Sequence, residues 1–223
     1  MTPSWDLFKP NLALVREHYI GVIYLFLLPS LVGVLGSTLI GAPVAVNGSL
    51  QLAPGQTVGL ALLLVSMVWQ LVNIGPLTVF QLRAAAGKTD SVGSYYRLGL
   101  RYDWSLIMYY IVFGVLAIGG LILFIVPGLF VIRRYFLGTY LLVDQDLPFG
   151  EALKQSADMS KPYSGAIWGI IGVQVALIFA AALAQSALSY FGIIIGELIA
   201  CSYVFLSVLR YREIKPAAKA PKA

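Results

Sequence analysis

The stretch from residue 19 to residue 82 contains no Asp, Glu, Lys or Arg, and this absence constrains the fold more than any other feature. About 20 apolar residues cross a bilayer, so the stretch is too long for a single crossing. It is interrupted by helix-breaking and polar residues, namely Pro43, Asn47, Gly48, Pro54, Gly55 and Gln56. The pattern predicts two transmembrane helices joined by a loop at 42–56.

Composition supports an integral membrane protein along the whole chain. Hydrophobic residues make up 59% of it and charged residues 11%, against roughly 25% charged residues in soluble domains. The net charge of +5 is the one expected beside an anionic membrane leaflet, and we predict no nucleic-acid binding. With a lone Cys201 and a lone His18, an internal disulfide and a His-rich metal site are excluded, and no cofactor is predicted.

The predicted fold is all-α: a polytopic membrane protein with six transmembrane helices in three hairpins. The boundary between the third and fourth spans decides the count, because 104–132 could also be read as one long span. A tight turn at 126–128 instead places both termini and nearly all basic residues on one side, which the positive-inside rule makes cytoplasmic. The predicted spans within the membrane domain 19–209 are 19–41, 57–82, 104–126, 128–143, 163–185 and 190–209.

Three segments outside the spans have the pattern of amphipathic helices at the membrane surface: 1–18, 91–103 and 148–161. Each precedes a predicted hairpin, so the chain could consist of three copies of one unit, although any helix entering a membrane tends to have amphipathic flanks. The basic tail 210–223 is predicted to be disordered. The predicted interfacial basic residues are Arg97, Arg101, Lys154 and Lys161.

Arg133 and Arg134 fall inside the fourth predicted span, where an arginine costs about 2.5–3.5 kcal/mol even on lenient scales. Counted from the predicted outer turns, they lie at about the same depth as Glu197 at 1.5 Å per residue. Two interpretations follow. One is a structural ion pair between helices four and six, and the other is an anion site, such as one for a lipid phosphate.

The second predicted span carries a candidate polar kink formed by Gln70, Asn73 and Pro76, because proline removes one backbone hydrogen bond. Such a kink can form part of a pathway, but more often it is accommodated by packing between helices. Asp144 and Asp146 are the only close carboxylate pair. They could hold a divalent ion, but the end of a span is also a typical place for a solvated turn.

One region resembles a known family. The residues that carry the resemblance are Val126-Pro127-Gly128-Leu129-Phe130, Arg134, Leu142-Val143-Asp144, Glu151-Ala152-Leu153 and Ser156. Over about 120–170 the chain is similar to the membrane domain associated with bacterial glycerophosphoryl diester phosphodiesterases and to related stand-alone six-span proteins. The resemblance implies a six-helix bundle in a bacterial inner membrane with a role in lipid or envelope homeostasis. In that family the catalytic domain is separate and soluble, so no enzyme activity is transferred.

Function is accordingly predicted as that of a non-enzymatic membrane bundle acting through lipid binding or partner docking. Its predicted partners are membrane lipids with anionic headgroups and a cytoplasmic protein, and homo-oligomerisation stays open. The alternative is a transporter or channel component for a small anionic or lipid-like solute. A small membrane enzyme acting at Asp144 and Asp146 is the least favoured hypothesis, because no recognised phosphate-binding, zinc or serine-hydrolase motif is present.

Overall fold

The computed structural model describes residues 1–40, 44–46, 49–51 and 54–219, and within them it is almost entirely helical. Six helices in these ranges are long and apolar enough to cross a membrane, which confirms the predicted six-span all-α fold. These candidate spans are Tyr19–Ile40, Pro54–Val72, Val92–Leu123, Val126–Asp144, Ser164–Ala187 and Phe191–Lys215.

The first hairpin is formed by two apolar helical spans, Tyr19–Ile40 and Pro54–Val72, which approach each other closely. A Cβ on Gly36 would lie 2.8 Å from the carbonyl oxygen of Gly59, so only glycine allows this contact. A short antiparallel pair of strands, β1 and β2, lies at the turn. Of the predicted loop 42–56, the structure describes residues 44–46, 49–51 and 54–56. The elements are α1 (Phe8–Glu17), α2 (Tyr19–Val22), the π-helix η1 (Ile23–Leu27), α3 (Leu28–Ile40), β1 (Val44–Val46), β2 (Ser49–Gln51), α4 (Pro54–Val72) and α5 (Ile74–Ala85).

The second hairpin turns at Phe124, whose extended backbone separates two helices. Its position agrees with the predicted turn at 126–128 to within two residues. A Cβ on Gly120 would lie 2.8 Å from the Cα of Gly128, so the two helices touch directly after the turn. The elements are α6 (Val92–Leu123), α7 (Ile125–Tyr135), α8 (Gly138–Asp144) and α9 (Phe149–Ser160).

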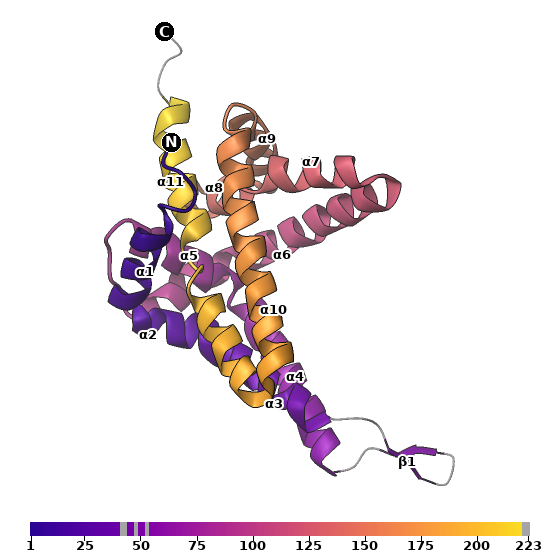
Figure 1. The fold of residues 1–223 in the computed structure, drawn as a ribbon. Coiled ribbons are helices and arrows are strands. Elements are labelled where there is room, and N and C mark those ends of the chain that lie inside the picture. Colours follow the sequence, from indigo (N-terminus) through magenta and orange to yellow (C-terminus); the bar gives the residue numbers. More distant parts are fainter. Residues whose placement is uncertain (41–43, 47–48, 52–53, 220–223) are drawn as a thin grey trace.

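The third hairpin lies within α10 (Ser164–Cys201), which reverses direction near residues 188–190 (Figure 1). The amide nitrogen of Gln174 donates a 2.8 Å hydrogen bond to the hydroxyl of Ser207, which a straight helix at 1.5 Å per residue would hold about 50 Å away. A short irregular turn then leads into α11 (Leu206–Lys219).

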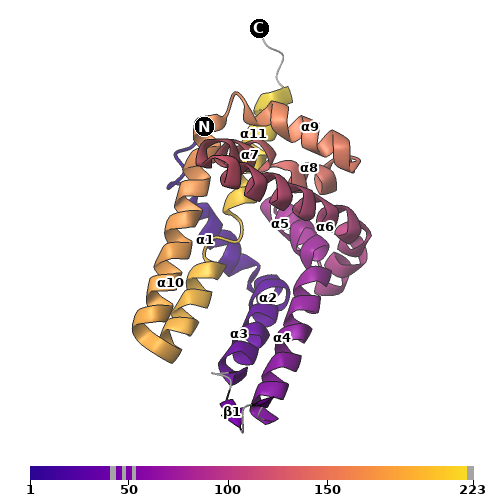
Figure 2. The same ribbon diagram turned by 90° about the vertical axis from the view of Figure 1, so that its right-hand side faces the viewer.

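The three hairpins diverge from a shared end of the molecule, which we call the base and define by α1, α8, α9 and α11. The N-terminus and the end of α11 lie at the base (Figure 1). The α3–α4 and α10 hairpins extend to the opposite end, whereas the α6–α7 hairpin projects to the side. The view in Figure 2 shows the α10 hairpin and the α3–α4 hairpin side by side along the long axis.

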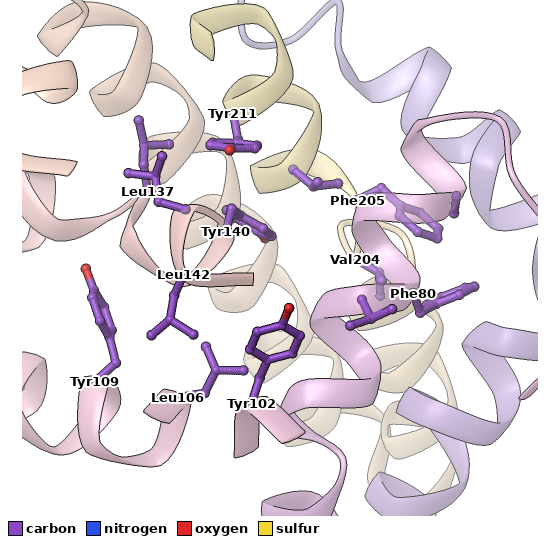
Figure 3. Close-up of a cluster of buried hydrophobic side chains, with 14 of the residues drawn as sticks. Phe80, Tyr102, Leu106, Tyr109, Leu137, Tyr140, Leu142, Val204, Phe205 and Tyr211 are labelled. Carbon is purple, nitrogen blue, oxygen red and sulfur yellow. The ribbon is translucent and has the colours of Figure 1, made fainter. Parts of the chain in front are cut away.

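An aromatic core joins the hairpins at the base (Figure 3). Phe80 of α5 lies 5.3 Å from Phe205, measured between ring centroids, and Tyr140 of α8 stacks on Tyr211 at 5.5 Å. All four side chains are less than 8% exposed. Because α5, α6, α8 and α11 all contribute to this core, hydrophobic burial fixes the base, while the hairpins beyond it remain covered with apolar side chains suited to lipid.

Several predicted boundaries are corrected. The predicted surface helix 91–103 and the span after it form one continuous helix, α6, because no breaker separates them. The predicted span 57–82 is divided at Asn73, and the span 128–143 is divided at 136–137. The segments predicted as surface helices at the N-terminus and at 148–161 contain the helices α1 and α9, and their place at a membrane surface stays a prediction. Asn11 of α1 is buried, as are Leu7 and His18 at its two ends.

The predicted disordered tail 210–223 is wrong for most of its length, since α11 continues to Lys219; residues 220–223 lie outside the described ranges. The side chain of Arg210 is completely buried, and its contacts explain why this segment is helical. Its guanidinium donates to the hydroxyl of Ser4 at 2.9 Å and to the carbonyl of Thr2 at 3.0 Å, and it pairs with Glu213 at 2.6 Å. The charged side chain of Arg210 therefore attaches the N-terminal segment to α11.

Candidate functional site

A cavity of about 760 Å³ lies between the α3–α4 hairpin and the returning half of α10, and we call it the Glu197 cavity. Its volume falls in the range of about 300–1,000 Å³ typical of small-molecule sites. Both polar and apolar side chains line the cavity. The lining is Leu25, Phe26, Pro29, Ser30, Met67, Gln70, Leu71, Asn73, Ile74, Leu77, Thr78, Gln81, Tyr110, Tyr140, Glu197, Ala200 and Tyr203.

Glu197 brings a carboxylate into this cavity from the returning half of α10. The residue is 8% exposed, and both of its carboxylate oxygens lie 2.8 Å from the hydroxyl of Ser30, which donates to them. At 1.5 Å per residue from the turn near residue 190, it lies about 10 Å into the membrane domain. An ionisable group at such a depth is costly and by default indicates a functional site.

Two prolines, Pro29 and Pro76, interrupt backbone hydrogen bonding in the helices of the cavity wall opposite Glu197. Pro29 has no N–H, so the carbonyl of Leu25, four residues earlier, lacks its usual helical partner. The side-chain amide of Asn73 donates a 3.1 Å hydrogen bond to that carbonyl. Asn73 also accepts a hydrogen bond from the hydroxyl of Tyr96, and Pro76 three residues later prevents α4 from continuing through this point. At the position of the predicted polar kink, α4 ends at Val72 and α5 begins at Ile74.

Close packing of α5 against α6 holds this break in place. A Cβ on Gly75 or on Gly99 would overlap the backbone of the other helix, so both positions require glycine. The free N–H of Gly75 at the start of α5 donates a 2.7 Å hydrogen bond to the carboxylate of Asp103, which suits the positive end of a helix dipole.

Further hydrogen bonds give the cavity wall a fixed shape. Gln70 donates to Ser66 at 2.9 Å, and Ser66 in turn donates to the carbonyl of Pro29 at 2.7 Å. At the end nearest the base, Gln81 donates to the carbonyl of Val204 at 2.8 Å and accepts from Tyr140 at 3.3 Å. These bonds connect four separate elements around one space.

The cavity also reaches the surface that faces lipid. Met67 and Leu71 of α4 and Tyr110 of α6 line it, yet their side chains are 60%, 48% and 47% exposed. In a membrane protein an exposed apolar surface of this kind is in contact with acyl chains. The cavity thus has polar groups in its interior and exposed apolar side chains at its rim.

The predicted ion pair between Glu197 and an arginine is not formed. Arg133 and Arg134 lie in the last turn of α7, where this oblique, short hairpin has already returned toward the base. The guanidinium of Arg133 lies 4.7 Å from the ring centroid of Phe130, and Arg134 is exposed. Within the described ranges neither arginine is within ion-pair distance of a carboxylate. The depth argument was wrong because it assumed parallel hairpins; an anion site at these arginines stays a prediction.

The predicted interfacial basic residues are all exposed, as a lipid-facing or solvent-facing role requires. Arg101 lies 3.7 Å from Asp146, and Lys161 lies 3.7 Å from Asp158; for Arg97 and Lys154 the described residues show no ion pair.

The carboxylates of Asp144 and Asp146 do not converge on one site. Asp144 pairs with Lys215 and accepts from Tyr211 at 2.6 Å, whereas Asp146 faces Arg101. Asp144 therefore attaches α8 to α11, and no cluster of three metal-ligating side chains lies within the described ranges.

Sequence reasoning missed Ser30, Ser66 and Gln81 as members of the site. One signal was available for Gln81, since it follows Asn73 by eight residues and so repeats the same helical face. Ser30 carries no such signal, because a serine after a proline in an apolar helix is a common feature of membrane spans.

Comparison of the chain with protein-family models, with curated proteins and with solved structures finds no match. The resemblance to the phosphodiesterase-associated membrane domain therefore rests on the residues given above and stays a prediction.

Proposed function

We propose that this protein is a non-enzymatic membrane protein that binds a lipid-like amphiphile in the Glu197 cavity. The observation that carries the proposal is a space of about 760 Å³ with polar groups in its interior and exposed apolar side chains at its rim. An amphiphile can enter such a site from the bilayer, leaving its chain beside Met67 and Leu71 while its polar end reaches Ser30 and Glu197.

We further propose that the protein resides in a bacterial plasma membrane with the base on the cytoplasmic side. The support is the distribution of charge, because the basic residues gather on segments of the base and around α6 and α9. The exposed side chains of Arg97 and Lys154 would then face anionic headgroups, each contributing about 1 kcal/mol of attraction. A role in lipid or envelope homeostasis is consistent with both features.

The alternative, a transporter or channel component, requires that the cavity also open toward the base. At that end Tyr140, Val204 and Phe205 are less than 8% exposed, and the hydrogen bond between Tyr140 and Gln81 spans the gap between α8 and α5. A binding role therefore fits this arrangement better than a continuous path.

The proposal can be tested by native mass spectrometry of the purified protein, comparing the lipids that remain bound. Ala200→Trp fills the cavity from α10 and should remove most of the retained lipid. Ile194→Trp is the matched control, because residue 194 is on the same half of α10, is 57% exposed and does not line the cavity. Equal lipid retention by wild type and both variants would refute the proposal.

A further inference from the structure

We infer that the amphiphile bound in the Glu197 cavity carries a positively charged nitrogen at its polar end, as an alkylammonium or quaternary ammonium group does. This inference rests on the proposed function, since it specifies the ligand of the same site. It differs from the sequence-based expectation of an anionic solute.

The charged side chain in the wall of the cavity is acidic. Glu197 is the one carboxylate in the described lining of the cavity, and no Lys or Arg is part of it. Arg133 and Arg134, which would have favoured an anion, lie on α7 and are not part of the wall. An anionic headgroup placed here would meet a like charge at low dielectric, whereas a cation would be attracted.

The described residues leave the hydrogen bonding of the Glu197 carboxylate incomplete. An ionised carboxylate has about four acceptor positions, and one hydroxyl supplies one hydrogen. Ser30 is the sole donor to Glu197 in the described part of the chain, shared between the two oxygens. Among the described residues nothing compensates the remaining acceptor positions or the charge itself. An ammonium group would supply a charge and, if protonated, hydrogen-bond donors.

The same wall contains several aromatic side chains. Phe26, Tyr110 and Tyr203 line the cavity together with Glu197. Aromatic rings attract ammonium groups through the negative face of the ring, and they do so also for quaternary ammonium groups that cannot donate a hydrogen bond. The apolar side chains of Leu25, Met67 and Leu71 are left for the chain of the amphiphile.

The test compares two probes that share a chain and differ in charge: dodecyltrimethylammonium and dodecanol. Binding of each to the full-length protein in a neutral maltoside detergent is titrated by native mass spectrometry. We expect wild type to bind the ammonium probe about tenfold more tightly than the alcohol, from the combined carboxylate and aromatic attraction. Glu197→Gln should bring the two affinities together, and Glu151→Gln, a control at an exposed carboxylate of α9, should leave the preference unchanged.

The outcomes separate the two proposals. If wild type binds both probes equally and Ala200→Trp abolishes both, the cavity binds amphiphiles without charge selection and the inference on the ammonium group is overturned. If neither probe responds to Ala200→Trp, the proposed function itself fails. Should Glu197→Gln not fold, Ser30→Ala serves as the second variant: it keeps the charge, so a preference lost in that variant would contradict the inference.

Discussion

Replacing Asn73 by alanine removes its hydrogen bonds with the Leu25 carbonyl and the Tyr96 hydroxyl and should destabilise the protein, mainly by leaving the carbonyl unpaired. The Asn73 amide donates to the carbonyl of Leu25, a residue 2% exposed, which cannot use the N–H that Pro29 lacks. Leaving a buried acceptor unpaired costs about 1–3 kcal/mol, but single hydrogen bonds between membrane helices average about 0.6 kcal/mol. We therefore expect Asn73→Ala to lower the free energy of unfolding by about 1–2 kcal/mol, which is measured by reversible unfolding in mixed dodecyl sulfate micelles.

A double-mutant cycle isolates the cause. In a Pro29→Ala background the new N–H at residue 29 can donate to the Leu25 carbonyl, four residues earlier. Asn73→Ala should then cost about 1 kcal/mol less than it does in wild type. Gln174→Ala is the control, because its bond to the hydroxyl of Ser207 does not involve the Leu25 carbonyl and should be additive with Pro29→Ala. Full additivity of Pro29→Ala and Asn73→Ala would refute the reasoning.

Three further predictions concern the frame around the site. Arg210→Met should lower the free energy of unfolding by about 2–3 kcal/mol, because charged hydrogen bonds to the N-terminal segment are lost. It should also speed proteolysis of that segment, and an unchanged cleavage rate would contradict the anchoring role of Arg210. Gly36→Ala should destabilise by about 1–3 kcal/mol, measured by the same unfolding assay, because the new Cβ meets the backbone of Gly59 at 2.8 Å; unchanged stability would show that α3 and α4 can separate freely. In a cysteine-free background, a cysteine at exposed residue Ala187 should react with an impermeant maleimide on intact cells and one at Lys88 should not, and the opposite labelling would invert the proposed orientation.

Local sequence patterns identified some residues of the site but not the residues that pair with them. Asn73 and Pro76 were predictable as a kink because a proline removes a backbone bond wherever it stands in a helix. Glu197 was identifiable because an isolated carboxylate in an apolar segment is costly in a membrane. Its partner was not, because Ser30 is one of several serines in apolar spans, and the choice depends on which two hairpins lie side by side.

What the sequence by itself determined is the class of protein, the six spans, the turn near residue 126 and the helix within 148–161. These features depend on hydrophobicity and helical periodicity, which are properties of a segment and its solvent. Only the tertiary structure decided the continuity of α6, the order of α11 and the separation of Arg133 from Glu197. The physical reason is that apolar spans are nearly equivalent in lipid, so their directions are set by close contacts such as Gly75 with Gly99 and by the aromatic core at the base.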